Sequence, residues 1–298
     1  MRENNRIEVY AGPVAPGFIY DMPAAVYHRD PCDTPSLSAS IGHRLLSESP
    51  KHAWLAHPKL GGAAAKNSKA FDRGSIVHEL LLGCGKGLEP IDAEDFKTKA
   101  ARESRDAAYA AGKTPVLQGD LADAMDVARR LEEQLDDLGI LLNGTSETVA
   151  IWEEPTQFGG SVICRGMMDH LILDAATIYD IKSIRSANPK VCQRHMVEYG
   201  YDIQWAAYTS ALGKLRPDLA GRTDFVFLFC ELDPPYCITP VRPSGSMRQL
   251  GQSKWDRAVE SWSFCRTSGK WRGYTEGIIE VEAPPWAMAQ ELGSDAAA

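Results

Sequence analysis

The sequence predicts an α/β protein in which helices flank a central mixed β-sheet, with a helical region toward the N-terminal end. Two observations support this class. From Thr145 onward, short runs of β-branched and apolar residues are separated by turn residues, which is the pattern of strands. Longer segments before and after them carry apolar residues at the three- and four-residue spacing of helices that bury one face. Strands flanked by helices in this way indicate helices packed on a sheet.

The predicted helices have recognisable starts and stops. Ser38 or Ser40 is expected to cap a short helix that ends before Pro50, and Asp120 to cap a later amphipathic one. The helices that we expect cover residues 38–49, 51–57, 70–82, 92–111, 120–138, 189–197, 201–212 and 247–267.

The predicted strands are short and concentrated in the second half of the chain. They cover residues 147–152, 161–165, 171–173, 178–183, 224–231 and 236–241. The turn at 174–177 is short enough to join two strands as a hairpin. Before the strands, the glycine- and lysine-containing segment 61–69 is expected to be a flexible basic loop.

Composition limits the classes of protein that the chain can form. Charged residues at 24% and hydrophobic residues at 44% are typical of a globular protein, and no apolar run approaches transmembrane length, so we expect a cytoplasmic protein without a membrane partner. The seven cysteines are dispersed without a C-x-x-C spacing, which argues against a disulfide framework and against a structural zinc or iron–sulfur site. The net charge of −8 is unfavourable for binding nucleic acid, although local clusters matter more than the sum.

The hairpin carries two acids and a lysine. Asp169 begins its first strand, while Asp180 and Lys182 lie on its second and point to the same face because side chains alternate along a strand. Pairing of the strands would place Asp169 across from Asp180. Two carboxylates and an ammonium at one sheet edge suit a divalent cation and a phosphate. Taken alone, the same residues could form only an exposed salt bridge.

Other residues could complete such a site. His78, on an apolar helix, could add an imidazole ligand for Mg²⁺ or Mn²⁺, or could be an ordinary core histidine. The backbone carbonyl of Ile181 could be a further ligand. Lys182 would orient a water molecule or stabilise charge on phosphorus, and Gln204 and Tyr208, four residues apart on one helix, could hydrogen-bond a phosphate.

Three motifs in the chain resemble those of the PD-(D/E)xK nuclease superfamily. Gly166-Met-Met-Asp169 followed by Asp180-Ile-Lys182-Ser183 looks like its core signature. Gly74-Ser-Ile-Val-His78 resembles the G-x-x-x-H helix of the RecB-like and RecE-like branches, and the segment from Gln204 to Tyr208 is similar to their Q-x-x-x-Y helix. The strongest likeness is to RecE-type exonucleases of phages and prophages. It implies a restriction-endonuclease-like core and a single nuclease domain over residues 27–287. The polar or Pro- and Gly-rich start is expected to be an N-terminal extension over residues 1–26, and the end of the chain a disordered tail over 288–298.

The resemblance also implies an activity. RecE-type enzymes degrade linear double-stranded DNA from its ends, 5′→3′, leaving 3′ single-stranded tails for homologous recombination. By position, His78, Asp169 and Asp180 become metal ligands and Lys182 the catalytic lysine, with one or two Mg²⁺ or Mn²⁺ ions and no iron–sulfur cluster. Expected partners are DNA ends, a RecT-like single-strand annealing protein, and further copies of the chain in a ring.

Several alternatives stay open. Some relatives use a helical glutamate, so Glu79 is a candidate beside His78, although adjacent helical side chains diverge by about 100°. Glu147 could join the site or pair with Arg165. Ser183 and Arg185 are candidate substrate contacts. Two basic groups could meet DNA or simply be solvated: one contains Lys190 and Arg194, the other Lys66, Lys69 and Arg73.

Other functions are compatible with part of this pattern. A RecB- or Cas4-like single-strand exonuclease and an endonuclease would share the core. A catalytically inactive DNA-binding module would keep the fold, but intact acids and lysine weigh against it. Glycoside hydrolysis by two carboxylates would leave the lysine and the histidine without a role.

Overall fold

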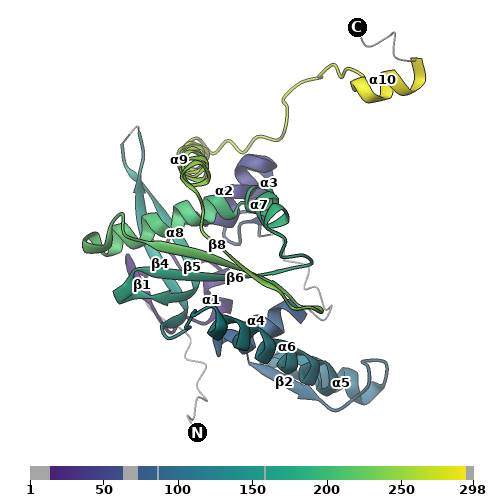
Figure 1. The fold of residues 1–298 in the computed structure, drawn as a ribbon. Coiled ribbons are helices and arrows are strands. Elements are labelled where there is room, and N and C mark those ends of the chain that lie inside the picture. Colours follow the sequence, from purple (N-terminus) through teal and green to yellow (C-terminus); the bar gives the residue numbers. More distant parts are fainter. Residues whose placement is uncertain (1–13, 63–72, 86, 158, 293–298) are drawn as a thin grey trace.

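The central feature of the computed structural model is a six-stranded mixed sheet (Figure 1). The model describes residues 14–62, 73–85, 87–157 and 159–292. In spatial order the strands are β1 (Gly17–Ile19), β4 (Thr145–Pro155), β5 (Ser161–Ile172), β6 (Thr177–Ile184), β7 (Asp224–Glu231) and β8 (Ile238–Val241). Within this sheet β6 and β7 pair in parallel, and the other neighbouring strands pair antiparallel. The predicted mixed α/β fold is confirmed.

Helices cover both faces of this sheet (Figure 1). One face carries α2 (Ala39–Ser47), α3 (Pro50–Ala56), α7 (Pro189–Glu198), α8 (Tyr201–Leu215) and α9 (Gly245–Ser268), and the other carries α4 (Arg73–Leu82) and α6 (Gln118–Asp137). Strand β7 shows why both faces are buried. Phe225, Phe227 and Phe229 pack in the first layer, while the alternate residues Val226 and Leu228 pack in the second.

Helix signals in the sequence were mostly correct. Ser38, not Ser40, caps α2 by accepting a hydrogen bond from the amide of Ile41. Asp120 does not cap α6, because the helix begins earlier, at Gln118, and Asp120 lies in its first turn. The predicted basic loop 61–69 falls largely outside the described residues.

A small unit beside α4 was not predicted. Strands β2 (Leu88–Ile91) and β3 (Thr114–Leu117) pair in parallel, joined by α5 (Lys99–Ala110). The helix expected over 92–111 begins later because Thr98 adopts an extended backbone and caps it. Each strand is four residues long and contains a proline, which hides it from propensity arguments.

The two ends of the chain differ from expectation. Within the predicted extension 1–26, β1 pairs with β4, and α1 (Ala24–His28) follows directly. Residues 288–292, expected in a disordered tail, belong to α10 (Pro285–Leu292), which lies at the end of an arm away from the sheet (Figure 1). Among the helices of the described segments, none is long and apolar enough to cross a membrane. All seven cysteines are free.

Candidate active site

The acids of the hairpin lie where two paired strands separate. β5 and β6 pair only through residues 170–172 and 177–179, around a turn in which Ala176 has φ 51°. Further from the turn these two strands separate from each other, while β5 stays paired with β4 and β6 stays paired with β7. Asp169 and Asp180 are the first residues of this fork, and the amide of Ile181 donates to Asp169 Oδ2 at 2.8 Å instead of pairing with backbone. The predicted hairpin is confirmed.

Asp180 is a completely buried carboxylate. Its Oδ1 forms an ion pair with Lys182 Nζ but accepts no hydrogen bond of regular geometry, and its Oδ2 accepts from Gln204 Nε2 on α8. Burial, followed by the charge of Asp169, raises the pKa of Asp180 to about 6. The fold therefore holds this acid in surroundings that oppose its ionisation unless positive charge is near.

His78 reaches the fork from α4. Its Nε2 lies 3.1 Å from Asp169 Oδ2, so this histidine is not isolated in the core, and its role as a metal ligand stays a prediction. Burial lowers the pKa of His78, but the hydrogen bond with Asp169 and the carboxylate charges outweigh it, so the pKa is raised. For Asp169, burial acts in the opposite direction and raises the pKa, but His78 and Lys182 together hold the pKa of this acid below its ordinary value.

Lys182 is the cation of the fork. Burial lowers its pKa, but the charges of Asp180 and then Asp169 prevail and raise it, so the side chain is an ammonium at neutral pH. Its Nζ also lies 4.9 Å from the centre of the Tyr201 ring. Tyr201 adjoins the Q-x-x-x-Y motif but was not identified from the sequence, because an aromatic at a helix start is normally a packing residue.

Tyr208 contacts the protein behind the fork. It is buried, and its hydroxyl donates to the carbonyl of Met167 at 3.0 Å. A Cβ on Gly166 would lie 2.5 Å from the Tyr208 ring, so the glycine makes room for the tyrosine. Its predicted contact with substrate stays a prediction, and the contacts that the structure gives it position β5.

The two glutamates occupy different places. Glu79 Oε1 accepts from the amide of Gly87 at 2.8 Å, so this carboxylate turns toward the loop after α4, while His78 turns to Asp169. Glu147 has φ 48°, an uncommon backbone conformation for a residue with a side chain, at the position across from Asp169 in the β4–β5 register. Arg165, considered as its partner, instead contacts Asp30 and Ser36.

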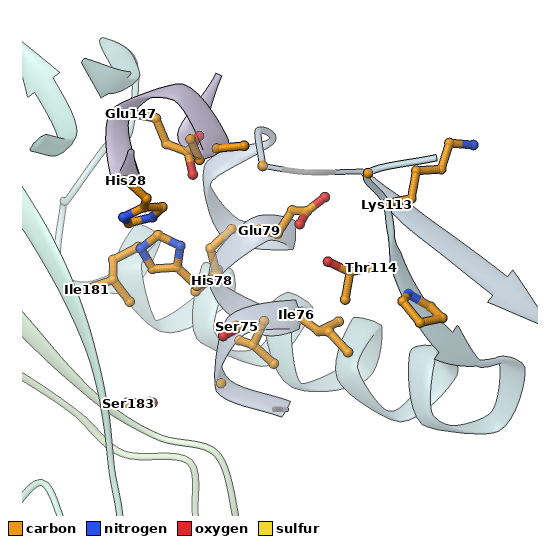
Figure 2. Close-up of a pocket in the computed structure, with 18 of the residues that line it drawn as sticks. His28, Ser75, Ile76, His78, Glu79, Lys113, Thr114, Glu147, Ile181 and Ser183 are labelled. Carbon is orange, nitrogen blue, oxygen red and sulfur yellow. The ribbon is translucent and has the colours of Figure 1, made fainter. Parts of the chain in front are cut away.

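A groove of about 990 Å³ opens beside the fork on the α4 side. Figure 2 shows His78, Ile181 and Glu147 toward one end and Lys113 and Thr114 toward the other. His28 of α1 also lines this groove, and no sequence signal pointed to it (Figure 2). Ser183 lines the groove and is exposed, and Arg185 is exposed directly after the end of β6, so both are accessible to a bound molecule.

The predicted basic groups are only partly described. Arg194 forms an ion pair with Glu198 at 3.4 Å on the surface of α7, and Lys190 is exposed at the start of that helix. Arg73 pairs with Asp233 at 2.8 Å, whereas Lys66 and Lys69 lie outside the described residues. A role in binding DNA therefore stays a prediction for these side chains.

The donor atoms of the fork fit a divalent cation in kind. Within the described part of the chain, no three His, Cys, Asp or Glu side chains are already gathered as a metal cage. However, two carboxylates and an imidazole converge here, and Asp180 Oδ1 is buried without a hydrogen bond. These are hard oxygen donors and a nitrogen donor of the kind that Mg²⁺ or Mn²⁺ accepts.

Residues 39–235 match the family described as a PDDEXK-like domain of unknown function, DUF3799. The chain belongs to this family. The matched region contains the G-x-x-x-H helix, the hairpin and the Q-x-x-x-Y helix, so the PD-(D/E)xK superfamily suggested by these motifs is confirmed. No curated protein matches the sequence.

One solved structure shares the fold of this chain. A crystal structure of a protein from Eubacterium rectale, provisionally described as an exonuclease, superposes with a TM-score of 0.57 at 14% identity, covering 91% of this chain and 98% of that chain. At this identity the similarity shows the fold alone. The protein SSO0001 aligns over 60% of this chain and 84% of that chain at 14% identity, but its TM-score of 0.26 is too low to carry an argument.

Proposed function

We propose that this PDDEXK-like protein is a metal-dependent nuclease that hydrolyses phosphodiester bonds of DNA. The observation that carries the proposal is the fork itself, where Asp169, Asp180, Lys182 and His78 meet beside an open groove. A structural salt bridge would not need a second buried carboxylate next to the first, because each added buried charge is costly. A site that binds a cation and a phosphate does need two neighbouring carboxylates, because they hold the cation.

The roles follow from the contacts. His78, Asp169 and Asp180 would hold the metal, which when bound would polarise a phosphoryl oxygen and lower the pKa of a coordinated water. Lys182, kept protonated by the two acids, would donate to the attacking water or to the phosphoryl oxygens as charge develops there. Gln204 holds Asp180 in place through its Oδ2, and the amide of Ile181 does the same for Asp169.

We further propose the RecE type of action: digestion of linear duplex DNA from its ends, 5′→3′, leaving 3′ single-stranded tails for recombination. Support comes from the three motifs and from the similarity to the Eubacterium rectale protein that is provisionally described as an exonuclease. A RecT-like annealing partner and a ring of several copies belong to the same proposal. The ring would gather basic side chains around DNA despite the net charge of −8.

Digestion of defined DNA substrates tests this function. Linear duplex labelled at either 5′ or 3′ end, closed circular duplex and single-stranded DNA are incubated with Mg²⁺, with Mn²⁺ or with EDTA. We expect metal-dependent loss of linear duplex, early release of the 5′ label, and no cutting of closed circles. Equal cutting of circles would identify an endonuclease, preference for single strands a RecB- or Cas4-like exonuclease, and inactivity in both metals would contradict the proposal.

A matched pair of variants identifies the helical ligand. His78→Ala should lower the digestion rate by about 10²–10³-fold, because it removes a group that contacts Asp169 at the fork. Glu79→Ala should change the rate only a few-fold, because Glu79 accepts from Gly87. The reverse ranking would assign the ligand to Glu79. Thermal unfolding of both variants controls for loss of structure.

A further inference from the structure

Three aromatic rings lead from Lys182 to the surface of the protein. Tyr201, at the start of α8, lies under the Lys182 ammonium at 4.9 Å. Its ring stacks on Tyr199, with ring centres 6.0 Å apart and planes at 26°. The Tyr199 ring lies 4.8 Å from the ring of His195 on α7. We call Tyr201, Tyr199 and His195 the aromatic ladder.

The two tyrosines of this ladder differ in environment. Tyr201 is half-buried and also stacks on Phe227 in the core, with ring centres 5.8 Å apart. Tyr199 is 56% exposed, although it sits between two other rings. Exposure alone does not distinguish Tyr199, since Tyr20 is also 45% exposed; what distinguishes Tyr199 is that its ring is held against Tyr201, which lies beside Lys182. The exposed part of the Tyr199 ring is available to another flat group.

The backbone fixes the ladder in place. Tyr199 ends α7 and Tyr201 begins α8, with Gly200 between them at φ 72°. A Cβ on Gly200 would lie 2.5 Å from the ring of His43, so the turn is packed tightly against α2. Such a turn holds both tyrosines in register with Lys182, which lowers the entropic cost of binding a ligand there.

From these contacts we propose that the aromatic ladder is a stacking site for an unpaired nucleobase next to the phosphate held at the fork. This inference rests on the proposed nuclease function and specifies the substrate form that the same site takes. Bases inside a duplex already stack on neighbours on both faces, so an exposed tyrosine ring takes a base that has left the duplex or one at the end of a strand. The arrangement therefore favours a substrate strand that is single-stranded where it passes Lys182.

The surroundings of the ladder suit a nucleic-acid strand. Lys190 is exposed on α7, the helix of His195, and Arg194 lies on the same helix in an ion pair with Glu198, while Lys182 lies at the inner end. These cations can follow the phosphates, while the rings contact a base without reading its identity. The ladder lies toward α7 and α8, whereas the groove opens on the α4 side of the sheet, so the fork stands between two binding surfaces.

Binding of oligonucleotides containing one abasic position tests this site. Fluorescence anisotropy is measured in EDTA with single-stranded oligonucleotides in which the abasic position is moved along the strand. In the unsubstituted protein, one position should weaken binding roughly five- to a hundredfold. Tyr199→Ala should weaken binding of the intact strand by a similar factor and should no longer respond to that position. Tyr199→Trp should restore both, because it restores a flat ring.

Tyr20→Ala is the matched control, since Tyr20 is 45% exposed beside β1 at the edge of the sheet. It should bind like the unsubstituted protein. If Tyr199→Ala binds as well as the unsubstituted protein, or if these two proteins respond equally to every abasic position, the stacking site is refuted even if linear DNA is digested. If the unsubstituted protein digests no DNA but shows an abasic response that Tyr199→Ala lacks, the stacking site is supported and the nuclease function is refuted. If no single-stranded oligonucleotide binds, the stacking site is refuted.

Discussion

Two histidine–aspartate pairs in this protein have almost the same geometry and opposite surroundings. His78 Nε2 lies 3.1 Å from Asp169 Oδ2 at the fork, and His57 Nε2, at the end of α3, lies 3.2 Å from Asp30 Oδ2. The second pair is fully buried, whereas the first retains 29% and 16% side-chain exposure beside a groove. Distance alone does not separate a structural pair from a site.

The carboxylates near each histidine show the difference. Both oxygens of Asp30 are satisfied, because Oδ1 accepts from Ser36 Oγ at 2.8 Å and Oδ2 from the Ser36 amide at 2.8 Å, with Arg165 3.4 Å away. Burial raises the pKa of Asp30, but His57 and Arg165 outweigh it and hold it at about 2. At the fork a second buried acid, Asp180, has its pKa raised to about 6. In the Asp30 cluster the neighbours stabilise the carboxylate charge, whereas at the fork two carboxylates lie close together and oppose each other's ionisation.

The largest expected effect comes from removing the carboxylate of Asp180. Asp180→Asn should reduce DNA digestion by about a thousandfold or more, equivalent to about 4 kcal/mol in the barrier, because it removes a metal-binding oxygen and the partner of Lys182. Steady-state digestion of labelled linear duplex in Mg²⁺ measures it. The free energy of unfolding in EDTA at neutral pH should change little, because a buried negative charge and its ion pair with Lys182 are lost together. Full activity in this variant would remove Asp180 from the site.

The same substitution at the other pair should act on folding. Asp30→Asn leaves the buried guanidinium of Arg165 without its counter-charge, so we expect a loss of about 3 kcal/mol in the free energy of unfolding. Urea unfolding followed by circular dichroism measures it. Activity per folded molecule should stay within a few-fold of the unsubstituted protein. A stable but inactive Asp30→Asn protein would mean that this cluster has a catalytic role.

The smallest effect is a dependence of stability on pH that has opposite signs in the two clusters. Asp180 has its pKa raised from 3.8 to about 6, so it contributes stability below pH 4 that is lost as the pH rises to about 6. Asp30 has its pKa lowered to about 2, so its contribution is present above pH 4 and is lost as the pH falls toward 2.

Urea unfolding in EDTA at several pH values checks these signs. Relative to Asp180→Asn, the unsubstituted protein should lose on the order of 2 kcal/mol between pH 4 and pH 7. Relative to Asp30→Asn, its advantage should be constant over that range. Adding Mg²⁺ at pH 7 should restore stability in the unsubstituted protein and not in Asp180→Asn, because a ligand of the folded state stabilises it. An identical pH profile in all three proteins would contradict the charge assignment.

The sequence revealed the fork far better than the buried pair. Asp169, Asp180 and Lys182 lie on two adjacent strands, so strand periodicity and one short turn bring them together. His78 required the likeness of its helix to known motifs. By contrast, Asp30, His57 and Arg165 come from three separate parts of the chain, and their meeting depends on tertiary packing that local patterns do not encode.

The same limit applies to the missed elements. β1 is three residues long, and β2 and β3 contain prolines, so they exist because neighbouring elements hold them. The aromatic ladder was missed for a related reason. Tyr199 and Tyr201 are ordinary in sequence and become notable only when their rings, Lys182 and the Gly200 turn are seen together.

The packing of Tyr208 against Gly166 links two motifs that are far apart in the sequence. The glycine lies on β5 in the segment that leads into Asp169, and the tyrosine ends the Q-x-x-x-Y motif on α8, yet a Cβ on Gly166 would meet the Tyr208 ring at 2.5 Å. A larger residue at 166 would therefore need a smaller one at 208, whereas a smaller residue at 208 alone would leave a cavity behind the strand that carries the first acid. The support behind Asp169 thus depends on both motifs together.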